Sequence, residues 1–410
     1  MKVAVCNLGC KVNKYECDCI MKLLENRGFD VTPSLERADA YILNTCAVTN
    51  EAERKSRQFV TRCLRFNPSA CVAVIGCASQ NGADAFRAKD RVTYIAGTAD
   101  KAAAALRFLE KVTDMAPLPT VYDGPSDPAD DRTRAYIKVQ DGCDRYCSYC
   151  LIPYLRGRSR SRDLEECVRE CADVARRSRE IVLTGIDLSS YGKDTGSSLA
   201  ELVRALSDLD VRIRLGSLEV GAIDDGLLTA LAGLKRFCPQ FHLSLQSGSD
   251  AVLKKMNRRY TAEEYAGKVG EIRSVFPDSA ITTDLICGFP TETEENFAES
   301  AAFLRRIGFA QVHVFGYSKR AGTVAAKFRQ LSPQVVDDRV ARACEVAAEC
   351  KDAFLRGRAG RKLNVLVETY EDGYSIGHSE EFIKTYIPAA AEGVVTVTAV
   401  RPYRDGMIAE

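Results

Sequence analysis

Residues 141–162 read "DGCDRYCSYCLIPYLRGRSRSR" and place Cys143, Cys147 and Cys150 in a C-x₃-C-x₂-C pattern. A β-type segment, "AYIKVQ" at 135–140, comes directly before them. Thiolates are soft metal ligands, and cysteine-only metal sites usually take four of them. The three thiols therefore favour a [4Fe–4S] cluster with one open iron. A zinc site that lacks one protein ligand and a set of unrelated core cysteines remain as alternatives.

Outward from this stretch, β-type and helical segments alternate through residues 135–356. After "AYIKVQ" come "EIVLTG" (180–185), "VRIRLGS" (211–217), "FHLSLQ" (241–246), "ITTDLICG" (281–288) and "AQVHVFGYS" (310–318). Six such units predict a (β/α)₆ partial TIM barrel, closed by a long helix from about 333 to 356. A barrel of this kind carries its chemistry on the loops that follow the carboxyl ends of its strands.

Two further units flank the predicted barrel. Residues 1–114 contain four apolar segments separated by helical ones: "VAVCNLG" (3–9), "AYILNTC" (40–46), "CVAVIGC" (71–77) and "VTYIAGT" (92–98). They predict a doubly wound parallel sheet. Residues 115–134 are rich in proline and acids and are interpreted as a linker, and residues 360–410 hold five short β-type segments that predict a small β-barrel. The fold class is thus α/β with a C-terminal β-barrel.

A second group of cysteines lies in the N-terminal unit. Cys10, Cys46 and Cys77 each come just past the end of a predicted parallel strand. The loops after such strands share one edge of a doubly wound sheet, which is where ligands bind. The three thiols can therefore meet in space, although position alone leaves three separate buried or reactive thiols as the alternative.

Composition limits the classes of protein to consider. The 410 residues carry a formal net charge of +1 and include 17 cysteines. The chain has no apolar run of membrane-spanning length and no signal-peptide pattern at its start, so we expect a cytoplasmic protein without a membrane partner. Many cysteines in that compartment indicate metal or redox chemistry. The balanced charge means that any binding of a polyanion has to come from local patches.

The cysteine triplet, with Tyr149 before its last member, resembles the signature of the radical S-adenosylmethionine (SAM) enzymes. The resemblance implies that the open iron holds the amino and carboxylate groups of SAM, whose reductive cleavage gives a 5′-deoxyadenosyl radical. It also implies SAM contacts at the ends of the barrel strands, where turn glycines and serines are otherwise common. The candidates are Gly185, Asp187, Ser217, Glu219, Gln246, Ser247, Ile286, Gly288 and Tyr317, with Phe289 and Arg320 beside them.

The whole chain resembles the methylthiotransferases, in motifs such as "GCKVNKYE", "NTCAVTNEAERKSRQ" and "LSLQSGSDAVLKKMNRRY". That resemblance implies a second [4Fe–4S] cluster on Cys10, Cys46 and Cys77, which carries or donates sulfur. It implies a C-terminal TRAM barrel that binds RNA, two SAM molecules per product, an external electron donor and a sulfur source. No catalytic side chain beyond the cofactor ligands is identified.

The arginines of "RGRSRSR" suggest a contact with nucleic acid. Arg156, Arg158, Arg160 and Arg162 alternate, so in an extended segment they face one way, beside the mouth of the SAM site. An isolated charge run is usually a solvated face. Next to an active site, and in a chain with a TRAM-like barrel, it predicts contact with RNA phosphates.

The residues after Cys10 indicate the substrate. Lys11-Val12-Asn13 resembles the methylthiotransferases that act on N6-threonylcarbamoyladenosine, whereas those acting on isopentenyladenosine typically read Gln-Met-Asn there. The threonylcarbamoyl carboxylate would need a cation, which Lys11 or Arg320 could supply. We therefore expect methylthiolation of C2 of that base at position 37, in the tRNA anticodon stem-loop. Isopentenyladenosine, a ribosomal-protein aspartate, and an RNA-binding protein with structural metal sites are the alternatives.

Overall fold

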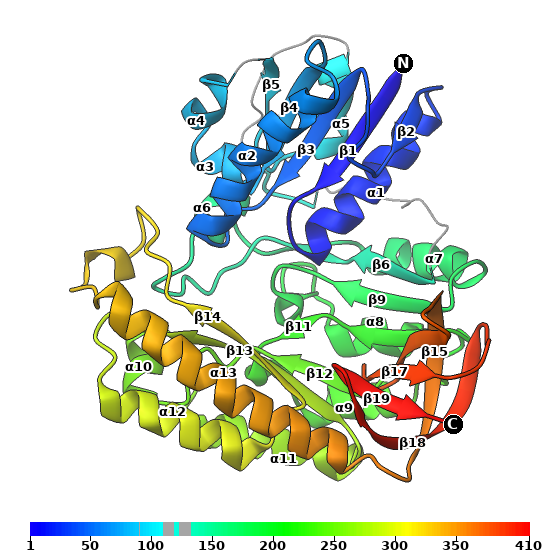
Figure 1. Cartoon of the computed structure of the whole chain (residues 1–410), viewed down its shortest axis with the longest axis vertical. Helices are drawn as coiled ribbons and strands as arrows, with labels where there is room; N and C mark the ends of the chain where they lie inside the picture. Colours follow the sequence, from blue (N-terminus) through cyan, green and yellow to red (C-terminus); the bar gives the residue numbers. More distant parts are fainter. Residues whose placement is uncertain (90, 110–118, 123–132) are drawn as a thin grey trace.

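The structure is a computed structural model that describes residues 1–89, 91–109, 119–122 and 133–410. Figure 1 shows three units: a blue N-terminal sheet domain, a larger domain with an open barrel, and a red C-terminal barrel at its side. The predicted linker, 115–134, lies largely outside the described residues, and the predicted domain limits stay predictions. Within the described ranges, none of the helices combines the length and the apolar character needed to cross a membrane.

The N-terminal domain is a five-stranded parallel sheet in the order β2-β1-β3-β4-β5. Its strands are β1 (Lys2–Asn7), β2 (Asp30–Thr32), β3 (Ala40–Thr45), β4 (Cys71–Gly76) and β5 (Val92–Ile95). The four predicted strands are present, and the short edge strand β2 is additional. Side chains of β3 and β4 are almost all buried because helices cover both faces of the sheet.

Those helices are α1 (Lys11–Glu25), α2 (Asn50–Phe66), α3 (Cys77–Asn81), α4 (Asp84–Arg87) and α5 (Lys101–Leu109). Helices α1 and α5 share one apolar core with the sheet, and α2, α3 and α4 share the other. The Thr49 side chain caps α2 by accepting a hydrogen bond from the Ala52 amide. The loops that carry Cys10, Cys46 and Cys77 all leave the same edge of this sheet.

The second domain contains the six predicted barrel strands. They are β6 (Arg134–Lys138), β9 (Glu180–Thr184), β10 (Arg212–Leu215) with its continuation β11 (Ser217–Leu218), β12 (Gln240–Leu243), β13 (Ala280–Cys287) and β14 (Gln311–Gly316). All pair in parallel, in the orders β10-β9-β6 and β11-β12-β13-β14. The consecutive strands β10 and β11 join the two sheets into one curved wall.

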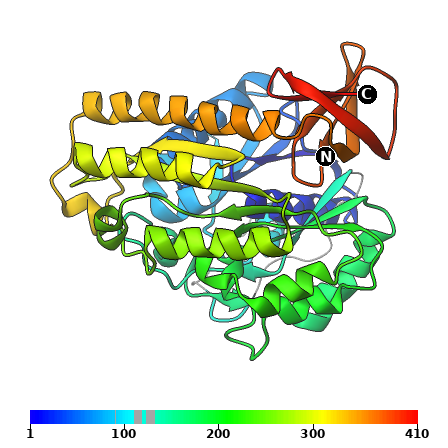
Figure 2. The same cartoon turned by 90° about the horizontal axis from the view of Figure 1, so that it is seen from below.

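Helices cover the outside of this wall. They are α7 (Leu164–Ala175), α8 (Leu199–Ala205), α9 (Asp225–Ala232), α11 (Ala262–Val275), α12 (Glu294–Ile307) and α13 (Pro333–Arg356). The short helix α10 (Asp250–Lys255) contacts the cysteine loop instead, where the Lys255 carbonyl accepts a hydrogen bond from the Ser148 hydroxyl. In Figure 2 the yellow α12 and the orange α13 lie side by side outside the strands. The loop after β6 contains three short elements, β7 (Gln140–Asp141), α6 (Ile152–Arg156) and β8 (Arg160–Ser161).

Alternation along the strands makes the inside of the barrel polar. Ile137, Leu183 and Leu215 belong to the apolar core beneath the helices. Because successive side chains of a strand point to opposite faces, Lys138 and Arg214 face the lumen, as do Arg134, Glu180, Thr184 and Arg212. An inner wall of this kind holds charged groups that have to be paired with one another or with a bound molecule.

The C-terminal unit is a closed barrel in the order β15-β16-β17-β19-β18. Its strands are β15 (Lys362–Glu371), β16 (Tyr374–Ser379), β17 (Lys384–Ile387), β18 (Val394–Tyr403) and β19 (Gly406–Ala409). Leu363, Val365 and Met407 are among its buried core residues. The barrel is held to β10 by Arg214, which donates hydrogen bonds to the backbone carbonyls of Ser379 and Glu380.

Candidate active site between two cysteine triplets

The loop that carries Cys143, Cys147 and Cys150 begins at a glycine that no other residue can replace without strain. Gly142 has a φ of +72°, and a Cβ atom there would lie 1.9 Å from the carbonyl oxygen of Arg158. Strand β7 before it pairs with β8 after the loop, so the cysteines lie on a closed loop at the carboxyl end of β6. This is the position that the barrel fold uses for chemistry.

Donors surround the three sulfurs of this loop. The backbone amides of Arg145 and Ile152 donate to the sulfurs of Cys143 and Cys150, at 3.5 and 3.4 Å, and the Arg258 guanidinium donates to that of Cys147 at 3.4 Å. N–H groups of this kind stabilise thiolates that ligate a cluster.

Burial raises the pKa of both Cys143 and Cys150 to about 12. Bound iron favours the deprotonated thiolate, so metal binding would counter that shift. The donor set fits an iron–sulfur cluster.

The second triplet lies at the edge of the N-terminal sheet. Cys10 precedes α1, Cys46 follows β3, and Cys77 begins α3. Burial is the main cause that raises the pKa of Cys46 to about 11, and the charges of Cys10 and Cys77 raise it further. Cys46 is therefore within electrostatic reach of both Cys10 and Cys77.

No group of three or more His, Cys, Asp or Glu side chains in the described ranges is close enough to share a single metal ion. A four-iron cluster does not require that, because each of its thiolates binds a different iron. The three thiols of each triplet, which do not converge on one metal ion, fit a four-iron cluster better than they fit one zinc ion.

Arg156, which follows the first triplet in the chain, contacts the second triplet. Its Nε atom donates to the sulfur of Cys77 at 3.3 Å, and its Nη2 atom donates to Asn13 Oδ1 at 3.1 Å. The sulfur of Cys10 donates to the same oxygen at 3.4 Å. Cys77 is also close enough to raise the pKa of Cys150, a shift that burial dominates. A residue of the barrel domain thus completes the surroundings of the N-terminal triplet.

The prediction that four alternating arginines form one exposed strip is wrong. Arg156, Arg160 and Arg162 are buried, and only Arg158, with 79% of its side chain exposed, faces solvent. The segment is a short helix followed by a two-residue strand, so it does not follow the period of one extended strand. Arg162 pairs with Glu170, and Arg156 pairs with Asp141 at 3.0 Å.

A buried charge network, not expected from the sequence, joins the two domains beside the site. Glu16 of α1 pairs with Lys101 at 2.5 Å, Lys138 at 3.0 Å and Arg156 at 3.2 Å. Lys138 also pairs with Asp141 at 2.6 Å. Burial alone would raise the pKa of Glu16, but the three cations hold it well below its ordinary value. The sequence signal was a polar face on α1, where Asn13 and Glu16 are one turn apart.

A cavity of about 230 Å³ lies between the loop of the first triplet, at Tyr149–Ile152, and the segment that follows Cys46. Its lining includes Val48 and Thr49 after Cys46, Cys150 itself, and residues at the carboxyl ends of the last barrel strands. Those strand-end residues are Gln246, Asp284, Ile286, Phe315, Tyr317 and Arg320. The cavity therefore borders both predicted cluster sites.

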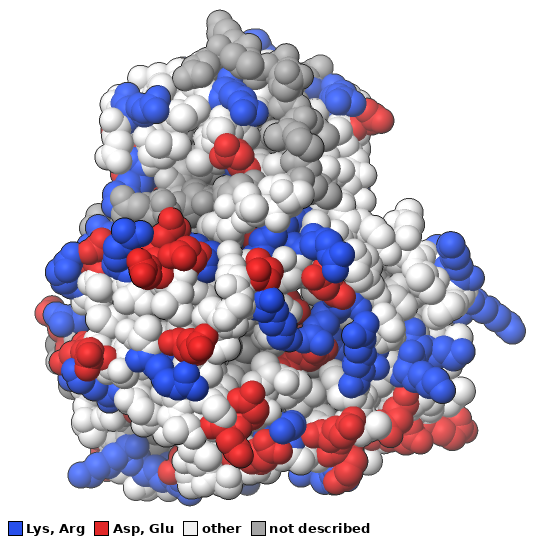
Figure 3. All heavy atoms as spheres, turned by 180° about the vertical axis from the view of Figure 1, so that it is seen from behind, with Lys and Arg blue, Asp and Glu red and all other residues white. Residues whose placement is uncertain are grey.

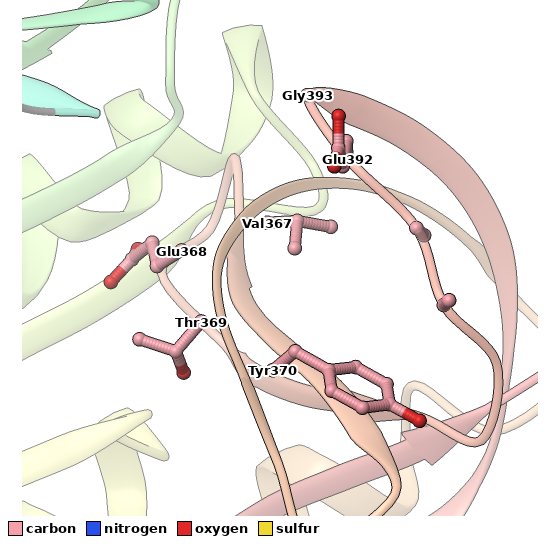
Figure 4. Close-up of a pocket in the computed structure, with 8 residues that line it drawn as sticks. Val367, Glu368, Thr369, Tyr370, Glu392 and Gly393 are labelled. Carbon is pink, nitrogen blue, oxygen red and sulfur yellow. The ribbon is translucent and has the colours of Figure 1, made fainter.

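A larger hollow of about 610 Å³ lies on the C-terminal barrel, between β15 and residues 390–393. In Figure 4, Val367 and Tyr370 line it, and Glu368 points away toward the second domain. Glu368 there pairs with Arg134 at 2.9 Å. No cysteine lines this hollow, so the smaller cavity is the candidate active site.

Five of the predicted SAM contacts lie around that site. Asp187 and Glu219 both pair with Arg145 of the cysteine loop, and Asp187 is 3.1 Å from its Nε atom. Gln246, Ile286 and Tyr317 line the cavity. These two carboxylates beside the first triplet could accept hydrogen bonds from the ammonium group of SAM.

The remaining predicted contacts have other surroundings. The Ser247 hydroxyl is fully buried and lies 3.2 Å from that of Ser300 on α12, outside the barrel. A Cβ atom at Gly288 would lie 2.6 Å from the Val336 side chain, so this glycine permits the approach of α13. Both residues are turned away from the cavity because they pack the strand ends onto helices. Gly185 lies against Gln140, and the Ser217 side chain is exposed.

Profiles of two protein families match this chain. That of the Radical SAM superfamily matches residues 137–304, and that of the Uncharacterized protein family UPF0004 matches residues 2–97. A Threonylcarbamoyladenosine tRNA methylthiotransferase of Bacillus subtilis is 33% identical over 98% of this chain and 95% of its own length. One of Thermotoga maritima is 37% identical over 93% and 90%. The chain belongs to the radical SAM methylthiotransferase family.

Other methylthiotransferases are similar as well. A tRNA-2-methylthio-N(6)-dimethylallyladenosine synthase of Thermoanaerobacter sp. is 35% identical over 88% of this chain and 80% of its own length. Among solved structures, the radical SAM methyltransferase TsrM of Kitasatospora setae has a TM-score of 0.55 at 16% identity, over 77% of this chain and 74% of that one. At this identity the likeness concerns the fold alone.

Proposed function

We propose that this methylthiotransferase adds a methylthio group to C2 of N6-threonylcarbamoyladenosine at position 37 of tRNA. The observation that carries the proposal is the set of five relatives named threonylcarbamoyladenosine tRNA methylthiotransferases, 31–37% identical over 90% or more of this chain. The arrangement of the site supports it, since Cys150 of one triplet and the residues directly after Cys46 of the other line one cavity.

Each triplet holds a [4Fe–4S] cluster in this proposal. Cys143, Cys147 and Cys150 leave one iron free for SAM, and Cys10, Cys46 and Cys77 hold the cluster that handles sulfur. When bound, the cluster and SAM supply one-electron chemistry that can act on a carbon too unreactive for polar substitution. Arg258 and Arg156 hold the facing thiolates by hydrogen bonds, and Asp187 and Glu219 bind the SAM ammonium.

The RNA reaches this site along polar and aromatic surfaces. Arg158 is the exposed arginine at the rim of the cysteine loop. On the C-terminal barrel, the Arg404 guanidinium lies 5.3–5.8 Å from the ring centres of Tyr374, Tyr386 and Tyr403. Aromatic and cationic groups together suit single-stranded RNA, whose bases stack on rings while its phosphates seek positive charge.

The proposed reaction also implies a cellular compartment and partner molecules for the enzyme. All 17 cysteines are free thiols, which agrees with a reducing cytoplasm. An external electron donor and a sulfur source complete the reaction. The anticodon stem-loop is the expected partner, because position 37 lies next to the anticodon.

The first prediction concerns the product. The enzyme is reconstituted with iron and sulfide under anaerobic conditions and given SAM, a reductant and a sulfur source. It then acts on tRNA bearing either threonylcarbamoyladenosine or isopentenyladenosine at position 37. Digestion and mass spectrometry of the nucleosides should show the 2-methylthio product on the first tRNA only.

Other outcomes would correct the proposal at different levels. Product on the isopentenyl-bearing tRNA alone would change the substrate and keep the chemistry. Product on a ribosomal protein and on neither tRNA would refute the RNA assignment. Stoichiometric zinc without iron in the purified chain would favour a structural role for the metal sites.

A further inference from the structure

Two exposed tyrosines lie next to each other on the cysteine loop. Tyr146 and Tyr154 are 42% and 54% exposed, and their rings meet edge to face with centroids 5.7 Å apart. Between them in the chain, residues 149–152 line the cavity of the candidate active site. Both rings are therefore within a few residues of the wall of that cavity. Single exposed apolar side chains are common on protein surfaces, whereas two adjoining rings beside a site indicate a partner.

The backbone holds Tyr146 in an unfavourable conformation. Its φ is +50°, in the left-handed region that a tyrosine rarely adopts. The Asn257 side-chain amide donates to the carbonyl of Tyr146 at 3.0 Å and to that of Arg145 at 3.3 Å. Strained residues persist where their surroundings enforce them, and they cluster at functional sites. Here the enforced conformation belongs to a residue with an exposed aromatic ring.

Three exposed cations lie on the segment that packs against this loop. Lys254 and Lys255 end α10, and Arg259 follows it. Within the described ranges, their side chains have no hydrogen bond or ion pair. The Lys255 carbonyl accepts a hydrogen bond from the Ser148 hydroxyl at 2.8 Å, and the Ser148 amide donates to the Met256 carbonyl at 3.0 Å. The tyrosines and the cations are thus carried by two segments that are hydrogen-bonded to each other.

The acids of these two segments are already engaged. Residues 142–158 contain one acid, Asp144, which pairs with Arg158 at 3.0 Å. Residues 250–260 contain one acid, Asp250, which accepts a hydrogen bond from the Ala262 amide at 2.7 Å. The three exposed cations therefore have no acid on their own segments to neutralise them.

Adjoining rings beside unpaired cations match single-stranded RNA. The bases of an RNA loop stack on aromatic side chains, while its phosphates attract lysine and arginine. A protein partner fits less well, because the centres of protein interfaces are depleted of lysine. An enzyme that acts on a base takes it out of the stack, so the neighbouring bases lose a stacking partner. Exposed rings next to the cavity can replace that partner.

We propose that Tyr146 and Tyr154 form a stacking surface for the bases next to the modified nucleotide. Lys254, Lys255 and Arg259 bind the phosphates of the same RNA loop. The inference rests on the proposed function and names the surface that holds its substrate.

The test compares two RNAs that share a stem. One is the anticodon stem-loop with threonylcarbamoyladenosine at position 37, and the other is the same stem as a plain duplex without loop bases. Fluorescence anisotropy gives the dissociation constant of each for the reconstituted wild type, Tyr154→Leu and Phe66→Leu. Phe66 is the matched control because it is similarly exposed, at 47%, but ends α2 before β4, at the sheet edge opposite the cysteine loops.

The two RNAs separate stacking from charge. Tyr154→Leu should weaken binding of the stem-loop about 5- to 100-fold, the range for one lost base stack, and leave binding of the duplex unchanged. Phe66→Leu should match the wild type on both. A stem-loop affinity of Tyr154→Leu equal to that of the wild type would overturn the proposal, and so would an equal loss on both RNAs. Iron analysis checks that the clusters of Tyr154→Leu are intact.

A second variant tests the cations. With Lys254, Lys255 and Arg259 all replaced by Gln, the log–log slope of stem-loop binding against salt should be less steep by about 2 to 3, the value for three lost phosphate contacts. These residues are distant in the chain from both cysteine triplets, so the slope decides the proposal if Tyr154→Leu fails to hold iron. An unchanged slope would refute it.

Failure of the proposed function gives a different result. The variants would then bind as described, but the wild type would form no methylthio product on threonylcarbamoyl-bearing tRNA. Failure of the stacking surface alone would leave product formation by the wild type intact while the variants bind RNA as the wild type does.

Discussion

At the scale of residues, cysteines placed directly after strands could be located from the sequence, whereas arginines could not. A thiol that follows a buried strand has few possible positions, and glycines such as Gly76 and Gly142, both with positive φ, fix the turns before Cys77 and Cys143. Arg156 is long and flexible, and its partners Glu16 and Cys77 come from distant parts of the chain. The alternation of arginines along residues 156–162 carried no information about those partners.

The first residue-scale prediction concerns iron. Replacement of Cys10, Cys46 and Cys77 by alanine should lower the iron content from about eight to about four atoms per chain, because one of two four-iron clusters is lost. Reductive cleavage of SAM should persist, and methylthiolation should stop. The matched control replaces the buried Cys17, Cys63 and Cys171 and should keep all the iron. Full iron retention in the first variant would contradict the assignment of this triplet.

At the scale of elements, every predicted barrel strand is present, because each combines an apolar outer face with flanking turns. What the sequence could not indicate is how the polar inner faces pair. Arg134, Glu180 and Arg212 lie at matching positions on three neighbouring strands. Their pairing also holds the C-terminal barrel, since Arg134 binds Glu368 and Arg214 binds the carbonyl of Ser379.

This junction gives a pH-dependent stability. Burial alone would raise the pKa of Glu180, but Arg214 and Arg134 lower it from 4.5 to about 2. A depressed carboxyl pKa stabilises the fold above pH 4.5, and that contribution is lost as the pH falls toward 2. The shift corresponds to about 3 kcal/mol. Urea unfolding of the apoprotein should show wild type more stable than Glu180→Gln at pH 6, with the difference shrinking by pH 3. A difference that stays constant would show that Glu180 does not titrate in this range.

At the scale of the whole molecule, charges of both signs share the one face that Figure 3 shows. In Figure 3 lysine and arginine side chains alternate with acidic ones over the face opposite to that of Figure 1. This agrees with the net charge of +1. We therefore expect contact with tRNA to depend on exposed cations near the site, such as Arg158 at the cysteine loop.

The salt dependence of tRNA binding tests that contact. Arg158→Gln should make the log–log slope of the binding constant against salt less steep by about 0.7 to 0.9, the value for one lost phosphate contact. Arg356→Gln is the control, because Arg356 is similarly exposed, at 73%, and pairs with Asp352 as Arg158 pairs with Asp144, but lies at the end of α13. Equal slopes for wild type and Arg158→Gln would show that Arg158 makes no phosphate contact and is only a solvated surface residue.

The buried network around Glu16 has an evolutionary consequence. Its cations come from both sides of the residues between α5 and β6: Lys101 before them, Lys138 and Arg156 after them. Recombination between two relatives within residues 110–133 would join an N-terminal half from one protein to a C-terminal half from the other. If the charged residues of the two proteins differ, Glu16 would be left with one cation too few, and such a buried carboxylate is strongly destabilising. The two halves must therefore be inherited together, and natural exchanges at Glu16 should be accompanied by exchanges at Lys138 or Arg156.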